Sequence, residues 1–374
     1  MLYYLHLLSD YGKNLDAEIF KAFNVFQYIT FRAVAAGVTA FLLSLIFGNW
    51  VIRHLISLKL GQPIRSQEEV HRLHELHGNK AGTPTMGGVL LLGALLISVL
   101  LWARPTNPLV WLAIFSVVYL GALGFVDDYL KVTKKSSDGI SSRLKFVLQS
   151  LLAGLITAFF VWDPALSAHA AQLYVPFSKE PIIQNLGIFT FVLYLLVIVG
   201  SSNAVNLTDG LDGLAAGCTA TVAFGFAVLT YAAGNIKIAQ YLQIPFVQFS
   251  GELAVVCLAL VGAALGFLWW NCHPARVFMG DTGSLAIGGL LGVVAISAKQ
   301  ELLLALIGGV FVLEAGSVIL QVASFKTTGK RIFKMSPLHH HFELSGWKEG
   351  TVIVRFWILS VIFALLGLAT LKLR

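Results

Sequence analysis

Charged side chains are scarce in this sequence. Asp, Glu, Lys and Arg together make up 12% of its 374 residues, while 57% are hydrophobic. Soluble globular domains carry about twice that share of charged residues. The composition therefore excludes an ordinary soluble domain and indicates a protein that crosses a membrane several times.

Cysteine is also rare. Cys218, Cys257 and Cys272 show no CxxC spacing and lie mostly in or beside apolar runs, so we expect neither a disulfide framework nor a zinc site. The net charge of +7 comes from basic residues scattered between apolar runs, so we expect no nucleic-acid partner. We expect no cleavable signal peptide either, because Met1–Lys21 carries acidic residues instead of a basic leader.

Long uncharged runs recur along the whole chain. About 20 apolar residues cross the hydrocarbon core of a bilayer, and on that basis we predict about ten transmembrane helices in an all-α polytopic protein with a single domain over residues 1–374. Glu314 interrupts the ninth run. The predicted spans are Ala33–Ile52, Ala81–Ala103, Pro105–Val126, Phe146–Trp162, Pro181–Thr208, Gly213–Ile236, Leu253–Ala275, Thr282–Ala298, Leu302–Phe325 and Phe356–Leu371.

The basic residues set the predicted orientation. Connections after odd-numbered spans hold about twice as many Lys and Arg residues as the opposite side, which places them in the cytoplasm and both termini in the periplasm. Polar motifs gather on the same predicted side, so we expect one active site on the cytoplasmic face. These motifs are the Asp127–Asp128 loop, Asn203–Gly213, Asn271–Ser284 and Pro337–Glu343.

Aspartates dominate these motifs. Asp127 and Asp128 follow the third predicted span directly, and Asp209, Asp212 and Asp281 lie in the other motifs. Carboxylates brought together repel one another, so a cation is expected among them. Hard oxygen ligands favour Mg²⁺ shared with substrate phosphates. For the Asp127–Asp128 pair, the alternative is a solvated interfacial loop of mixed charge.

Asp209 and Asp212 are three residues apart, so they share a helical face if the sixth span begins near Asp209. Asn206 and Thr208 could then cap that helix, and Gly210 would let its backbone approach a ligand closely. The alternative is an acidic helix cap beside the membrane.

Three further features each allow two roles. Side chains of His339, His340 and His341 must diverge on a helix, so they are either hydrogen-bond donors for a diphosphate or sugar, or ordinary loop histidines. The glycine-rich stretch Lys80–Gly88, which includes Thr85, could contact a phosphate or base, or form a membrane-entry turn. Glu314 should face other helices, and we favour an interhelical hydrogen bond over catalysis.

Together these motifs resemble the polyprenyl-phosphate N-acetylhexosamine-1-phosphate transferase superfamily. Thr83–Gly88 and Pro337–Glu343 are similar specifically to its bacterial phospho-N-acetylmuramoyl-pentapeptide transferase branch. The stretches that carry the wider resemblance are Asp127–Asp128, Asn203–Gly213, Asn271, Phe278–Ser284 and Pro337–Glu343.

The resemblance implies transfer of phospho-N-acetylmuramoyl-pentapeptide from UDP-MurNAc-pentapeptide to undecaprenyl phosphate at the bacterial inner membrane, forming lipid I and UMP. It implies Mg²⁺ bound by Asp281, an Asp127 that deprotonates or orients the lipid phosphate, and a supporting role for Asp128. Direct attack is favoured over an aspartyl-phosphate intermediate. A homodimer is also implied.

The same resemblance implies a set of substrate contacts. Lys80, Gly210, Asp212, Asn271 and Phe278 would bind uridine, with the Phe278 ring stacked on uracil. Asp209 and the three histidines would line the diphosphate and sugar side. The full set of expected substrate contacts is Lys80, Thr85, Lys131, Asn203, Asn206, Asp209, Gly210, Asp212, Asn271, Phe278, His339, His340 and His341.

Two other functions fit the sequence less well. A sibling branch of the superfamily transfers GlcNAc-1-phosphate to the same lipid, and the histidine run argues for the muramoyl branch instead. A secondary transporter would place its acids near the membrane midplane on broken, repeat-related helices. Here the acids gather at one predicted face.

Overall fold

The structure is a computed structural model that describes all residues except 9–21, 59–81, 135–138 and 373–374. The described residues form helices joined by turns, with an antiparallel bridge between Leu173 and Ile183. The elements are η1 Leu2–Leu5, η2 Ala22–Gln27, α3 Ile29–Ser57, α5 Gly88–Trp102, α6 Pro108–Lys134, α7 Ser142–Trp162, α8 Ser167–Ala170, α9 Phe189–Thr208, α10 Leu214–Ala233, α11 Ile236–Leu242, η4 Ser250–Glu252, α12 Leu253–Asn271, α13 Gly280–Ser297, α14 Glu301–Ile307, α15 Gly309–Thr328, α16 Leu338–Glu343, α17 Glu349–Ala369 and η5 Thr370–Lys372.

Nine helices of the described chain are long and apolar enough to cross a membrane. With the shorter apolar helix α5, they confirm the predicted all-α polytopic fold of about ten spans. Several predicted boundaries were wrong; the fifth span, for example, begins as a helix at Phe189 instead of Pro181. The second span begins as a helix at Gly88 instead of Ala81, which lies outside the described residues. The ninth is divided at Gly308 into α14 and α15.

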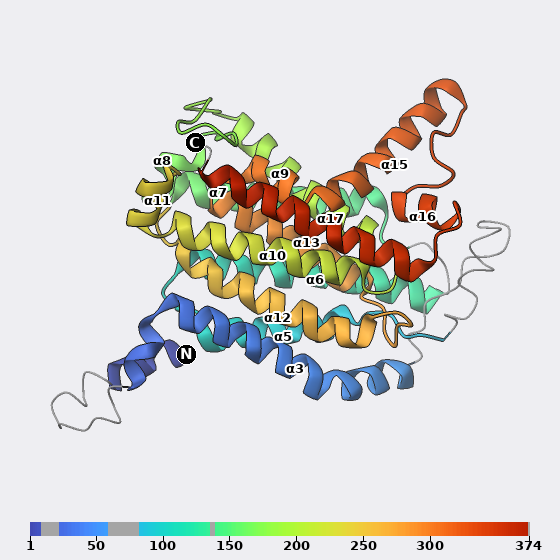
Figure 1. Cartoon of the computed structure of the whole chain (residues 1–374), viewed down its shortest axis with the longest axis horizontal. Helices are drawn as coiled ribbons and strands as arrows, with labels where there is room; N and C mark the ends of the chain where they lie inside the picture. The colour runs from blue at the N-terminus through green and yellow to red at the C-terminus, as the bar shows by residue number, and fades with distance from the viewer. Residues whose placement is uncertain (9–21, 59–81, 135–138, 373–374) are drawn as a thin grey trace.

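Helix α13 occupies the centre of the bundle, packed mainly against α6 and α9. Nearly all of its residues are buried, and many of them are Gly, Ala or Ser, which let neighbouring backbones approach closely. Figure 1 shows α3 along one edge of the bundle and α17 across another face, while α15 leaves the bundle at a steep angle. Apolar side chains on α3, α15 and α17 are exposed, as expected of surfaces that face lipid.

One end of the bundle gathers the first and last described elements. The Met1 amine donates to the carbonyls of Leu100 and Leu101 at the end of α5, and the Lys372 ammonium lies 3.9 Å from the ring centroid of Tyr241 on α11. A buried ion pair joins Arg32 of α3 to Glu252 of η4 at this end. The predicted site residues lie toward the opposite end. Its assignment to the cytoplasm stays a prediction from the basic residues.

Candidate functional site

Asp127 and Asp128 belong to helix α6, which continues to Lys134. The prediction of a loop at this position was wrong. Lys131 lies one turn beyond Asp127, and its ammonium is 2.7 Å from Asp127 Oδ2, so an i, i+4 ion pair supports the last turns of the helix. The two carboxylates are therefore held on a rigid element.

Asp128 joins α6 to the start of α13. Its Oδ1 accepts a hydrogen bond from the Asp281 N–H at 3.1 Å. Its Oδ2 accepts from the Thr282 N–H at 2.9 Å and from the Thr282 hydroxyl at 2.8 Å. A carboxylate from a neighbouring helix thus satisfies N–H groups in the first turn of α13, where the helix dipole favours negative charge.

Asp127 and Asp281 share two cations. The ammonium groups of Lys131 and Lys145 lie 2.7 and 3.1 Å from Asp127 Oδ2, and 2.9 and 3.2 Å from Asp281 Oδ2. The Ile140 N–H donates to the other Asp127 oxygen at 2.7 Å. Three helices, α6, α7 and α13, therefore bring two carboxylates and two ammonium groups to one point, as expected when like charges are brought together.

Helix α9 supplies the amide side chains beside this cluster. Asn206 donates to Asp281 Oδ1 at 2.6 Å and lies 2.8 Å from the Ser284 hydroxyl. The expectation that Asn206 and Thr208 cap the following helix was wrong, because both belong to the last turn of α9 and the Thr208 hydroxyl donates to the Ala204 carbonyl.

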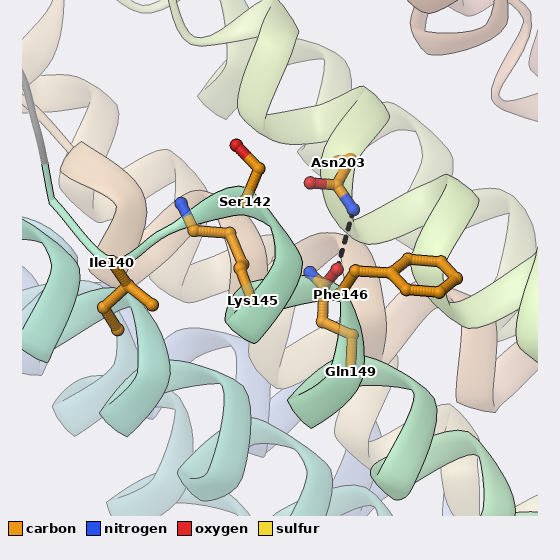
Figure 2. Close-up of a pocket in the computed structure, with 6 residues that line it drawn as sticks. All are labelled: Ile140, Ser142, Lys145, Phe146, Gln149 and Asn203. Carbon is orange, nitrogen blue, oxygen red and sulfur yellow. Dashed lines mark hydrogen bonds between the residues drawn. The ribbon is translucent and has the colours of Figure 1, made fainter.

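A pocket of about 390 Å³ opens beside the cluster, between α7 and α9. Figure 2 shows the side chains around it, with Asn203 of α9 donating to Gln149 of α7 at 2.9 Å. Lys145 reaches from this pocket to both Asp127 and Asp281. The volume suits a small ligand or the head of a larger one. The lining residues are Ile140, Ser142, Lys145, Phe146, Gln149 and Asn203.

Asp209 and Asp212 lie in the turn between α9 and α10, not on one helical face as predicted. Burial raises the pKa of Asp209 well above its usual range, and the negative charges of Asp281 and Asp128 raise that pKa further. Asp212 Oδ2 accepts from the Ala275 N–H at 3.0 Å and lies 3.1 Å from His273 Nδ1. One aspartate thus faces the acidic cluster, and the other fixes the loop after α12.

The predicted uridine residues line the neighbouring loops. Asn271 is buried; its oxygen accepts from the Gly213 N–H at 3.0 Å and its amide donates to the Val277 carbonyl at 2.8 Å. The half-buried Phe278 pairs through its backbone with the segment before α5, donating to the Pro84 carbonyl at 2.9 Å. Asn271 therefore holds two site loops together.

Three predicted substrate contacts remain, Thr85, Gly210 and Lys80. Thr85 is buried in the segment before α5, and Gly210 is exposed in the turn after α9. Lys80 lies outside the described residues.

The three histidines have three different partners, although the ring centroids of His339 and His340 lie 4.2 Å apart. His339 Nδ1 lies 2.9 Å from Glu314 of α15, His340 Nδ1 lies 2.9 Å from Glu343, and His341 Nδ1 accepts from the Lys334 N–H at 3.1 Å. The predicted interhelical hydrogen bond of Glu314 is confirmed by its contact with α16.

Several residues of the site were not predicted as such. Lys145 lies directly before an apolar run. A cation so close to a predicted span was a signal for a site residue, but it was used only to predict the orientation in the membrane. Thr282 and Ser284 lie in the Asn271–Ser284 motif but were given no role, and Gln149 is a polar residue inside an apolar helix, where spacing does not distinguish it from a packing residue. The missed residues are Lys145, Gln149, Thr282 and Ser284.

The cluster contains groups that could hold a hard divalent cation. Asp127 and Asp281 present carboxylate oxygens, and oxygen ligands are those that Mg²⁺ prefers. Asp209 and Asp128 bring the acids to four, against the two nearby lysines; burial is the main cause of the raised pKa of Asp209, and the negative charges of Asp281 and Asp128 raise it further. Asp281 could provide a ligand, with Asp127 and Asp209 nearby.

Comparison with known proteins gives three findings. The family model described as Glycosyl transferase family 4 matches residues 110–299, and a pattern described as Phospho-N-acetylmuramoyl-pentapeptide-transferase signature 1 matches residues 80–92. The chain is also 53% identical over 374 residues to a protein of Methylacidiphilum infernorum (isolate V4) named Phospho-N-acetylmuramoyl-pentapeptide-transferase, with 100% of both chains covered.

Proposed function

Because the chain belongs to the phospho-N-acetylmuramoyl-pentapeptide transferase family, we propose that it transfers phospho-N-acetylmuramoyl-pentapeptide from its UDP carrier to undecaprenyl phosphate, forming lipid I and UMP in peptidoglycan synthesis. The observation that carries the proposal is the meeting of Asp127 and Asp281 at two shared lysines, at one end of a membrane-spanning bundle. A lipid acceptor and a water-soluble nucleotide donor can meet at such an end.

Phosphoryl transfer brings anions together, so the protein must neutralise charge and position the two phosphates. Lys131 and Lys145 supply two ammonium groups at the cluster. We assign to Asp127 the orientation or deprotonation of the lipid phosphate, which then attacks the donor directly. Asp128 keeps the start of α13, and with it Asp281, against α6.

Mg²⁺ is the proposed cofactor, with Asp281 as its protein ligand. When bound, it would neutralise charge on the donor diphosphate. Asn206 supports this assignment because its hydrogen bond to Asp281 Oδ1 fixes the orientation of the carboxylate.

The donor nucleotide is proposed to lie over the loops that follow α9 and α12. Asp212 and Asn271 hold those loops together, and Phe278 of the second loop would stack on uracil. Gly210, Lys80 and Thr85 are proposed on the same side. Asp209 and the histidines would line the diphosphate and sugar, and Asn203 would lie nearer the pocket of Figure 2.

The proposed location is the bacterial cytoplasmic membrane, with the site on the inner face and both termini in the periplasm. Lipid I formation there would serve cell-wall synthesis during growth and division. We also propose a homodimer, on family resemblance.

The test uses purified protein in detergent with undecaprenyl phosphate and Mg²⁺. Either UDP-MurNAc-pentapeptide or UDP-GlcNAc is added, and UMP release is followed. UMP release with the muramoyl donor supports the proposal. Release with UDP-GlcNAc alone would assign the protein to the sibling activity, and release with neither donor would refute both.

A further inference from the structure

Glu314 is a fully buried carboxylate on α15, facing α16. It makes two contacts with a single residue, His339, which is also fully buried. One carboxylate oxygen accepts from the His339 N–H at 3.2 Å, and the other lies 2.9 Å from His339 Nδ1. A carboxylate can only accept, so Nδ1 carries a proton in this pair.

This pair fixes the direction of the imidazole. With its backbone and Nδ1 both held by Glu314, the ring directs Nε2 toward Gly210, where a Cβ atom would come within 2.3 Å of that nitrogen. Nε2 is buried and has no hydrogen-bond partner within the part of the chain that the structure describes. Gly210 directly follows Asp209, so the ring supports the turn that carries this acid.

A buried nitrogen without a partner costs about 1–3 kcal/mol. That cost is removed if a hydrogen-bonding group of a ligand reaches Nε2, or if the Gly210 turn shifts when a ligand binds. Nε2 of the neutral ring accepts a hydrogen bond, and Nε2 of a ring that carries two protons donates to an anionic oxygen.

We propose that Glu314 is a positioning residue for the donor side of the site, acting through His339 on the Asp209–Gly210 turn and on the donor diphosphate. This inference rests on the proposed function, because it takes the donor to be a nucleotide diphosphate bound at that turn. It assigns to α15, the helix that leaves the bundle in Figure 1, a direct link to the donor loop.

The first test is a double-mutant cycle with Glu314→Gln, His339→Ala and the double variant. Glutamine is neutral and has one acceptor oxygen in place of two. Each single variant is expected to lower kcat/KM for the UDP donor by about 10–100-fold, while KM for the lipid acceptor stays within about twofold. The double variant should be no worse than the more impaired single variant, because both changes remove one function.

Ser317→Ala is the matched control, since Ser317 is buried on the same helix and its hydroxyl donates to the Glu314 carbonyl. It should leave the donor KM unchanged. Additive losses in the double variant, or equal losses for donor and acceptor, would overturn the inference.

A second test uses a steric clash instead of a change in charge. Gly210→Ala should lower donor kcat/KM because its methyl group meets the His339 ring, and it should cause no further loss in a chain that already carries His339→Ala. A further loss in that chain would contradict the geometry. If wild-type protein turns over the muramoyl donor but these patterns are missing, this inference alone fails. If wild-type protein releases no UMP, the proposed function fails and the inference with it.

Discussion

A single methyl group added at Gly124 should separate the catalytic helices without changing any charge. Gly124 lies on α6 where the backbone of α13 passes closest, and a Cβ there would stand 2.1 Å from the Asp281 carbonyl oxygen and 2.7 Å from Thr282 Cα. Ordinary contacts begin near 3.4 Å, so the first turn of α13 must move by more than about 1 Å. Neither neighbouring atom belongs to a flexible side chain.

The expected loss follows from that displacement. Misplacing reacting groups by about 1 Å costs on the order of 100-fold in rate, and overpacking of this kind destabilises by about 1–3 kcal/mol. We therefore expect Gly124→Ala to remain folded in detergent, with a lower melting temperature and UMP release reduced by about 100-fold. The Asp128 bonds to the start of α13 would lengthen in the same movement.

Gly93→Ala is the matched control on α5. A Cβ at Gly93 meets nothing within 4 Å, so the change should leave kcat within about twofold and should stabilise the helix by up to about 1 kcal/mol. Steady-state UMP release and melting temperature are measured for both variants. Wild-type kcat in folded Gly124→Ala would refute the argument that close α6–α13 contact sets the site.

Three further outcomes are expected. Asp127→Asn and Asp281→Asn should each lower UMP release at least about 100-fold in folded protein; near-normal rates in both would remove the catalytic assignment. EDTA should abolish UMP release and added Mg²⁺ should restore it, whereas turnover that persists in chelator would contradict a magnesium requirement. Glu252→Gln leaves buried Arg32 without its charge partner and should destabilise by about 3–5 kcal/mol, measured as a lower melting temperature with kcat unchanged; a lower kcat would mean that the far end acts on the site.

The number of spans and the motifs at one end were predictable, because hydropathy and charge report burial in lipid directly. Helix boundaries were less so. The charges of Asp127 and Asp128 suggested the end of a span, yet α6 continues past them because Lys131 pairs with one acid and the first turn of α13 satisfies the other. The hydrogen bond between Asp128 and the first turn of α13 joins residues far apart in the chain, so no local sequence pattern predicts it.

Contacts between distant parts of the chain also decide the geometry within the site, and the sequence did not predict them. Asp209 and Asp212 were placed on one helical face by their spacing, but α10 begins at Leu214 and the two acids face different loops. Gly308, which divides the ninth predicted span, is one glycine among 35 in the chain. Distances between helices decide these details, and a single sequence does not report them.

The enclosure of α13 has a consequence for how the enzyme responds to its surroundings. The helix that carries Asp281 is almost entirely covered by other helices, so acyl chains touch its neighbours and not the helix itself. Changes in bilayer thickness or fluidity should therefore tilt peripheral helices such as α3 and α15 first. The distance between the Asp127 and Asp281 carboxylates would therefore stay the same in membranes of different lipid composition.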